Sequence, residues 1–335
     1  MSAPVLSVQG LTTTFTGRDP FEALTDICFE VRGGEVFAIL GESGCGKSVT
    51  ALSIVRLAGP TARVDGEVRL GNADLLSLDE SGMRGIRGAR IAMVMQNPFS
   101  ALNPAIRVGD QIAEAIRAHA SAEDAALFGR RSLLRRERRN GEVWRRVVRL
   151  LEQVGISDAA DAATRWPHEF SGGMCQRVVT AIALACEPEL LIADEPTTAL
   201  DVTVQREIIA LLDRIRHERD TGILLISHDF ALIGEFADRA AVLYAGQIME
   251  MATVDDLMRN PLHPYTSLLL ECVPDLGHEH ELATIPGTVP HRYDRIAGCR
   301  FHDRCPKAVD ACRTESQDLR ELEKGHFVRC HLATT

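Results

Sequence analysis

The chain has 335 residues, 45% of them hydrophobic and 25% charged, and its 47 acidic and 37 basic side chains give a formal net charge of -10. This composition is typical of a globular protein. The sequence shows neither an apolar run of about 18 residues nor a secretory leader pattern, so we expect a cytosolic chain that reaches a membrane only through a partner. The acidic total argues against a protein that coats nucleic acid, because that role needs a surplus of basic side chains.

Apolar runs alternate with helical patterns along the chain and predict an α/β fold, in which helices cover both faces of a mainly parallel sheet. An antiparallel β layer is expected at 5–8 and 27–31. The other expected elements are strands at 35–40, 91–95, 190–193, 223–227 and 240–244, and helices at 47–57 and 202–217. We divide the chain into a core of residues 1–97 and 171–258, a helical insertion at 98–170, and a small C-terminal extension at 259–335.

The strand at 35–40 leads into a glycine-rich turn and a helix, and residues 41–48 fit the pattern G-x-x-x-x-G-K-[ST]. The glycines of this pattern let backbone N–H groups turn toward phosphate oxygens, Lys47 would reach the β- and γ-phosphates, and Ser48 would coordinate Mg²⁺. Cys45 is interpreted as a small filler, with a reactive thiol as the alternative. The predicted ATP-binding residues of this loop are Gly41, Glu42, Ser43, Gly44, Cys45, Gly46, Lys47, Ser48 and Val49.

The strand at 190–193 ends in two adjacent carboxylates, Asp194 and Glu195. Unpaired charge at the end of a buried strand is costly, so a role in packing is a poor explanation for both. Asp194 suits a Mg²⁺ ligand, and Glu195 is placed to orient and deprotonate an attacking water. Downstream of a phosphate loop, this pair predicts an ATP-hydrolysing site.

Two further motifs complete a resemblance to the nucleotide-binding subunits of ABC transporters, which have a P-loop NTPase core. Gln96 looks like the glutamine of the family's Q-loop, which contacts Mg²⁺ and senses the membrane partner. Residues 170–176 look like the signature motif, in which Ser-Gly-Gly opens a helix and forms a second anion site. The resemblance implies that ATP binds between the phosphate loop of one subunit and the signature of another. The signature residues are Ser171, Gly172, Gly173 and Gln176.

The resemblance extends to three single residues. It implies that Asp201 belongs to the D-loop, that His228 contacts the γ-phosphate, and that Phe15 stacks on adenine, although a core role for Phe15 is the alternative. The catalytic set is then Glu195, His228 and Gln96, and the Mg²⁺ set is Ser48, Gln96 and Asp194. Cys175 departs from the pattern, because the related subfamily usually has a basic residue at this place.

Segments 97–104, 166–169, 193–203 and 260–266 resemble the oligopeptide and dipeptide importer ATPases in particular. This resemblance implies a peripheral subunit at the cytoplasmic face of the bacterial inner membrane. Its partners would be a second, distinct ATPase subunit, two integral-membrane permeases and, indirectly, an extracytoplasmic solute-binding protein. Nickel or oligosaccharide import is an alternative. An alternative from another functional class is an ABC ATPase that acts on nucleic acid or ribosomes. Such proteins typically have paired cassettes in one chain or a long coiled-coil insertion, and this sequence shows neither. We therefore expect no nucleic-acid partner.

Four of the nine cysteines follow the spacing C-x5-C-x6-C-x17-C near the C-terminal end. Clustered thiolates in a reducing compartment indicate a soft-metal site. The resemblance implies a [4Fe-4S] cluster, while Zn²⁺ bound by four cysteines and free or disulfide-bonded thiols remain alternatives. The candidate ligands are Cys299, Cys305, Cys312 and Cys330.

Residues 130–149 form a basic block of nine arginines with only two glutamates, a local surplus of +7. One interpretation is a solvated face that extends the helical insertion. The other is a surface that contacts anionic lipid headgroups or acidic permease loops.

Overall fold

The computed structural model describes residues 3–119, 141–198, 201–273 and 284–334. The chain forms two compact units, one made of Met1–Leu78 with Gly222–Thr335 and the other of Asp79–Thr221. Each unit combines strands and helices, so the predicted α/β class with an antiparallel N-terminal layer is confirmed. Among the described residues, none of the helices has the length and apolar character needed to cross a bilayer.

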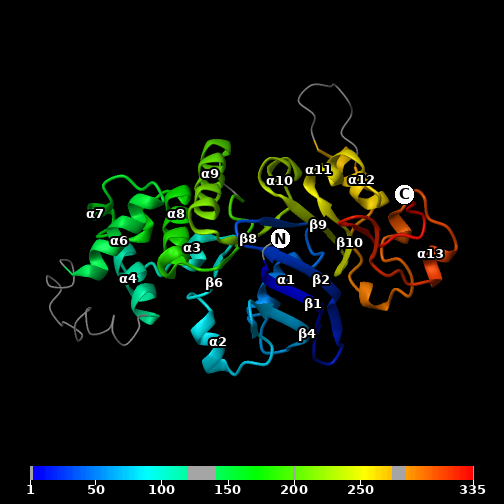
Figure 1. The fold of residues 1–335 in the computed structure, drawn as a ribbon, viewed down its shortest axis with the longest axis horizontal. Coiled ribbons are helices and arrows are strands. Elements are labelled where there is room, and N and C mark those ends of the chain that lie inside the picture. The colour runs from blue at the N-terminus through cyan, green and yellow to red at the C-terminus, as the bar shows by residue number, and fades with distance from the viewer. Residues whose placement is uncertain (1–2, 120–140, 199–200, 274–283, 335) are drawn as a thin grey trace. The chain divides into compact units, whose positions relative to one another are not determined.

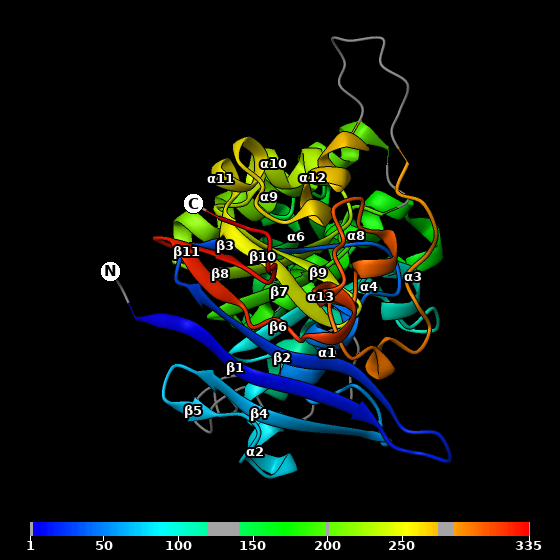
Figure 2. The same cartoon turned by 90° about the vertical axis from the view of Figure 1, so that its right-hand side faces the viewer.

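The first unit contains the antiparallel layer, in the order β2-β1-β4-β5 (Figure 2). Its strands are β1 (Pro4–Phe15), β2 (Phe21–Arg32), β4 (Ala62–Leu70) and β5 (Ala73–Asp74). The first two strands are longer than predicted. Register shifts interrupt the β1–β2 pairing, including one between Val8 and Leu11, and both strands continue beyond the short apolar runs on which the prediction relied.

The second layer of this unit has the order β11-β12-β10-β9-β3-β8. Its strands are β3 (Val36–Leu40), β8 (Gly222–Ser227), β9 (Arg239–Tyr244), β10 (Gln247–Thr253), β11 (Arg320–Glu323) and β12 (His326–Val328). The central β3 pairs in parallel with β8 and β9, and its residues are all buried, as expected for a strand covered on both faces. These three strands match the predictions to within a residue. The antiparallel strands β10, β11 and β12 were not predicted.

The helices of the first unit are mostly short. They are α1 (Lys47–Ile54), α10 (Phe230–Phe236), α11 (Val254–Arg259), α12 (Pro264–Glu271), α13 (Ala311–Thr314), η4 (Tyr293–Arg295) and η5 (His302–Arg304). Helix α1 ends before the predicted 57, because Arg56 adopts a left-handed conformation and the Leu57 N–H donates to the Leu52 carbonyl, as in a Schellman motif. Figure 1 shows α12 in yellow and α13 in orange-red, on the same side of the view as β10.

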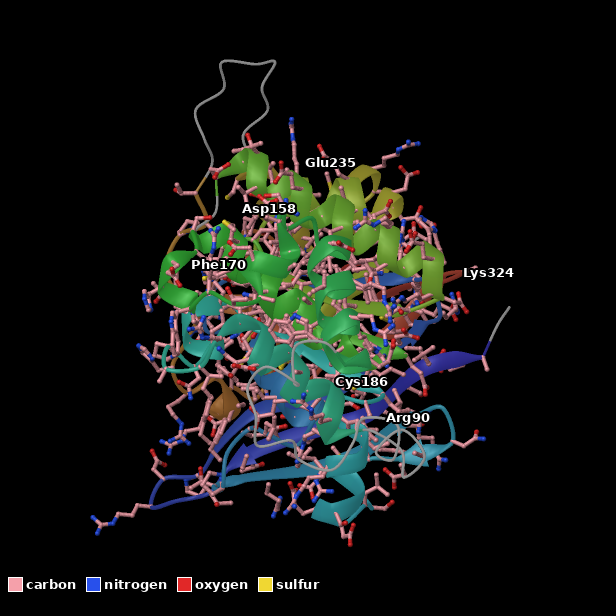
Figure 3. The ribbon with its side chains drawn as sticks, turned by 90° about the vertical axis from the view of Figure 1, so that its left-hand side faces the viewer. Arg90, Asp158, Phe170, Cys186, Glu235 and Lys324 are labelled. Atoms are coloured by element: carbon pink, nitrogen blue, oxygen red, sulfur yellow. The ribbon has the colours of Figure 1, made fainter. Side chains whose placement is uncertain are left out.

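The second unit pairs β6 (Ile91–Val94) in parallel with β7 (Leu190–Asp194) and is otherwise helical. Its helices are α2 (Glu80–Ile86), α3 (Pro98–Ala101), α4 (Val108–Ala118), α6 (Glu142–Gln153), α7 (Ala159–Ala162), η2 (Pro167–Glu169), α8 (Gly172–Ala183), η3 (Leu184–Cys186) and α9 (Val202–Arg219). Figure 3 shows this unit with Asp158, Phe170 and Cys186 labelled. No strand occurs in the described part of 98–169, in line with the expected helical character of this stretch.

Part of the arginine block is described, and it lies on an amphipathic helix. Helix α6 buries Val143, Val147 and Leu151, while Arg145 and Arg149 on its exposed side pair with Glu142 at 3.0 and 3.1 Å. These two arginines therefore belong to a solvated helix face. The rest of the block, residues 130–140, lies outside the described residues, so the lipid-contact alternative for it stays a prediction.

A buried carboxylate ties the C-terminal extension to the core sheet. Glu250 of β10 is completely buried, and its Oε1 lies 2.7 Å from His326 Nε2 of β12. The same carboxylate accepts the backbone N–H groups of Leu262 at 2.6 Å and His263 at 3.0 Å, just before α12. One side chain of the sheet thus holds two separate segments of the extension.

Replacing the Glu250 carboxylate should destabilise the folded state of the protein. We expect Glu250→Ala to lower the free energy of unfolding by about 3 kcal/mol, because it leaves buried donors without an acceptor. Urea unfolding followed by circular dichroism measures the change. Asp65→Ala, which removes the exposed ion pair with Arg63, should cost under about 1 kcal/mol; equal losses in the two variants would contradict the role assigned to Glu250.

Candidate functional site

The glycine-rich loop lies between β3 and α1, and its backbone accepts glycine alone at two places. A Cβ atom on Gly41 would lie 2.2 Å from the Leu243 carbonyl oxygen, and one on Gly46 would lie 2.8 Å from Leu24 Cδ2. Gly46 also has a left-handed φ of +111° and is the N-cap of α1. The spacing of the motif therefore reflects both close packing and backbone conformation.

Lys47 begins α1, and its side chain folds back over the loop. Its Nζ donates to the carbonyl oxygens of Gly41 at 2.7 Å and Glu42 at 3.0 Å. The side chain is buried, so its ammonium group is confined to the loop. With the positive end of the helix dipole, this charge makes the loop suited to an anion such as a nucleotide phosphate.

Cys45 points into the protein. It is fully buried, and a Cβ on Gly41 would come within 2.7 Å of its Sγ. Burial raises the pKa of its thiol to about 11. Because the thiolate is the nucleophilic form, this environment opposes the reactive alternative and agrees with the small-filler interpretation.

The second group of predicted residues meets at the carboxyl ends of β6 and β7. Gln96 Nε2 donates to Glu195 Oε2 at 2.7 Å, and the Thr198 hydroxyl donates to the same oxygen at 2.8 Å. Glu195 has a left-handed φ of +47°, uncommon for a residue with a side chain, and directly follows the buried Asp194. The carboxylate is thus oriented by two donors.

Thr198 is a part of this group that the sequence reasoning missed. Its N–H also bonds to the Glu195 carbonyl at 3.2 Å, which closes a turn after β7. The available signal was a threonine three residues after the glutamate, a position where hydroxyl side chains often bond back to the chain.

The predicted signature residues open α8. Ser171 is the N-cap, and its hydroxyl accepts the Met174 N–H at 3.3 Å. A Cβ on Gly173 would lie 2.6 Å from Val204 Cγ1, so this glycine permits close packing against α9. Gln176 is buried, and within the described residues its Nε2 has no hydrogen-bond partner.

Cys175, the departure from the family pattern, faces the interior. Its thiol lies 3.5 Å from the Pro167 carbonyl, and burial raises its pKa. The substitution therefore changes the interior packing of α8 rather than an exposed surface.

The remaining single residues occupy three different places. Asp201 caps α9 by accepting the N–H groups of Thr203 and Val204 at 3.1 and 3.0 Å. Residues 199–200 of the predicted D-loop lie outside the described residues. His228 is exposed and follows β8, and Phe15 is half-buried at the end of β1.

The four C-terminal cysteines line one pocket, together with residues such as His263 and Phe301. All four are free thiols. Burial raises the pKa of Cys299 to about 11, and the neighbouring Cys312, Cys330 and Cys305 add to the rise. Within the described ranges, no group of three or more histidine, cysteine or acidic side chains is arranged to hold a single metal ion. This finding gives no support to the expected [4Fe-4S] cluster or to the four-cysteine Zn²⁺ alternative.

Comparison with known families identifies the chain. The ABC transporter family model matches residues 24–198, which include the phosphate loop, Gln96, the signature and Glu195. The chain belongs to the ABC transporter family. A second family model, described as the oligopeptide/dipeptide transporter C-terminal region, matches residues 249–312, so this ABC ATPase belongs to the oligopeptide and dipeptide branch. It is an ATP-hydrolysing enzyme coupled to transport.

Similar proteins match this ABC ATPase over nearly its whole length. A probable peptide ABC transporter ATP-binding protein, y4tR of Sinorhizobium fredii, is 44% identical over 97% of this chain and 94% of that protein. The oligopeptide transport ATP-binding protein AppD of Bacillus subtilis and the dipeptide transport ATP-binding protein DppD of Escherichia coli are each 42% identical, over 98% of this chain and 96% of theirs. The solved dimeric ATP-binding cassette MJ0796, in a post-hydrolysis state bound to ADP and Pi, has a TM-score of 0.61 and 27% identity over 74% of this chain and 98% of that one.

The environment of Cys45 predicts slow alkylation. A pKa near 11 instead of 9 leaves about a hundredfold less thiolate at neutral pH, and burial blocks access as well. We expect N-ethylmaleimide to modify Cys45 far more slowly than the half-buried Cys272, as measured by peptide mass spectrometry. The difference should vanish in guanidinium chloride; rapid labelling of Cys45 in the folded ATPase would contradict this assignment.

Proposed function

We propose that this ABC ATPase powers the uptake of di- or oligopeptides through a pair of integral-membrane permease subunits. The observation that carries the proposal is the match of residues 249–312 to the C-terminal region of oligopeptide and dipeptide transporters. The printed names of y4tR, AppD and DppD, all peptide or dipeptide transport ATP-binding proteins, support it. No feature of the described residues favours nickel or oligosaccharide as the solute.

The phosphate loop is the proposed site for the ATP phosphates. Lys47 supplies the positive charge, the loop glycines supply backbone N–H groups, and Phe15 is the proposed adenine contact. Ser48, Asp194 and Gln96 are the residues that would hold Mg²⁺, whose charge would offset that of the phosphates. Each is an oxygen-bearing side chain, the ligand type that Mg²⁺ prefers.

Glu195 is the proposed general base, and His228 the proposed γ-phosphate contact. A general base must hold its carboxylate toward the attacking water. The donors from Gln96 and Thr198 to one oxygen of Glu195 support this role, because they restrict the rotation of the carboxylate. The link to Gln96 also offers a route by which a membrane partner could affect hydrolysis.

A second ATPase subunit, a distinct homologue, is the proposed partner at the signature. Ser171, Gly172 and Gly173 lie at the N-terminus of the 12-residue helix α8, where backbone N–H groups and the helix dipole favour an anion. ATP contacting both subunits would shift the population toward a closed dimer, since those contacts exist only in that state. Residues 98–170 are the proposed permease-docking segment, which would hold the subunit at the cytoplasmic face of the inner membrane beneath a solute-binding protein.

Glu195→Gln should separate binding from turnover. We expect MgATP affinity to be kept and hydrolysis to fall by at least about a hundredfold, because the amide cannot accept the proton of water. Isothermal titration calorimetry measures the MgATP affinity, and a phosphate-release assay measures the rate of hydrolysis. In cells, uptake of a labelled tripeptide should be lost while nickel uptake is unchanged.

Glu189→Gln is the matched control, since Glu189 precedes the same strand and pairs with Arg90 on the surface. Unchanged hydrolysis in Glu195→Gln would reject the general-base assignment. Loss of nickel uptake with intact peptide uptake would reject the proposed solute.

A [4Fe-4S] cluster is the proposed cofactor of the C-terminal cysteines. Iron–sulfur clusters of this type are held by four cysteine thiolates. The four free cysteines that line one pocket are the donors the proposal rests on. When bound, the cluster would cross-link the extension.

Anaerobically purified protein should therefore contain iron and acid-labile sulfide in equal amounts and absorb broadly in the visible range. Cys305→Ser should lose most of the iron, whereas Cys272→Ser, outside the pocket, should keep it. A colourless, iron-free preparation with an intact fold would overturn the cluster proposal without affecting the ATPase.

A further inference from the structure

The phosphate loop carries an acidic residue, Glu42, whose carboxylate is held by the C-terminal extension. Arg304 forms a bidentate pair with it, from Nη1 to Oε2 at 2.6 Å and from Nη2 to Oε1 at 3.0 Å. The arginine side chain is 6% exposed and that of the glutamate 29% exposed, so water screens this pair only in part. The contact joins residues 262 positions apart in the chain.

Tyr265 of α12 binds the same loop residue twice. Its hydroxyl accepts the Glu42 backbone N–H at 3.2 Å and donates to Glu42 Oε2 at 3.3 Å. Tyr265 is fully buried, and burial raises its pKa, so the hydroxyl stays protonated and available as a donor. The extension thus fixes both the backbone and the side chain of one loop position.

The two side chains of the extension are themselves held in place. Arg304 Nε donates to the Pro286 carbonyl at 2.7 Å, and its guanidinium lies over the ring of Tyr244 at 5.6 Å. Tyr244 and Tyr265 pack edge to face, with ring centroids 4.7 Å apart, and Phe301 packs against both. An aromatic cluster therefore orients the guanidinium toward the loop.

Two physical effects link this contact to phosphate binding. First, an unpaired carboxylate in the loop would repel an incoming polyphosphate, and Arg304 neutralises it. Second, the Glu42 carbonyl accepts from Lys47 Nζ, so the position of Glu42 determines where the phosphate-binding ammonium rests. Without the contact to Arg304, the Glu42 carboxylate would add negative charge to the loop. The Glu42 carbonyl would also hold the Lys47 ammonium less firmly.

We propose that Arg304 and Tyr265 are positioning residues for ATP binding, and that the C-terminal extension holds the phosphate loop in its binding conformation through Glu42. The proposal deepens the proposed function, because it rests on ATP binding at this loop. It assigns the extension a direct part in nucleotide affinity.

Arg304→Gln tests the charge, and Tyr265→Phe tests the backbone contact. We expect Arg304→Gln to weaken MgATP binding about tenfold and to raise KM for ATP by a similar factor, with a smaller change in kcat. Tyr265→Phe should speed hydrogen exchange of the Glu42 amide, since phenylalanine offers no acceptor for it. Titration calorimetry, steady-state kinetics and hydrogen-exchange mass spectrometry on the full chain give these values.

Arg292→Gln is the matched control. Arg292 belongs to the same extension, but it pairs with Asp19 and Asp294 and lies over Phe21, none of which belongs to the phosphate loop. It should leave ATP affinity unchanged. An equal loss in Arg292→Gln and Arg304→Gln would mean general anchoring of the extension and would overturn the proposal.

A double variant separates charge compensation from a folding defect. In Glu42→Gln/Arg304→Gln the unpaired carboxylate is gone, so ATP affinity should recover relative to Arg304→Gln alone. If ATP affinity does not recover in the double variant, the inference is rejected. It is also rejected if Arg304→Gln keeps both its native circular dichroism and its ATP affinity. Neither outcome affects the proposal that the wild type hydrolyses ATP. A wild-type chain that bound no ATP would instead reject the proposed function.

Discussion

The tight corner between β9 and β10 is the constraint on which the phosphate loop depends. Ala245 and Gly246 both have left-handed φ values, +48° and +76°, as expected for a two-residue turn of type I′ between antiparallel strands. The Gly246 N–H donates to the Cys45 carbonyl at 2.8 Å, and its own carbonyl accepts from Thr25. A Cβ on Gly246 would lie 2.4 Å from the Ala23 carbonyl, so the corner fits only with glycine. One turn thereby links the loop to the antiparallel layer.

The C-terminal extension uses the same corner. Arg300 donates from its buried guanidinium to the Ala245 carbonyl at 2.6 Å, and the Tyr293 hydroxyl donates to the Ala23 carbonyl at 3.1 Å. Burial lowers the pKa of Arg300, because a desolvated cation is costly, yet its hydrogen bonds keep it in place. The extension is therefore packed against the phosphate loop itself, in addition to its contacts with Glu250 of β10. An addition this closely joined to the loop can affect ATP binding as well as stability.

The sequence was most informative where chemistry depends on neighbouring residues. The phosphate loop and the strand ending in Asp194 and Glu195 could be predicted, because a short local pattern specifies both the backbone and the donors. Strand β10 could not, since Gln247 and Glu250 interrupt its apolar run and the buried role of Glu250 depends on the distant His326. The pairing of Glu42 with Arg304 was missed for the same reason: nothing near either residue in the sequence indicates the other.

The position of Arg304 suggests how the cysteine pocket and the loop could be related. Arg304 is the last residue of η5 and directly precedes Cys305, and His302 of the same turn bonds through Nδ1 to the Cys299 carbonyl at 2.7 Å. The segment that presents the guanidinium to Glu42 is thus bounded by two of the four clustered cysteines. Any group that fixes Cys299 and Cys305 would reduce the conformational freedom of this segment. Holding Arg304 against the loop would then carry a smaller entropic cost.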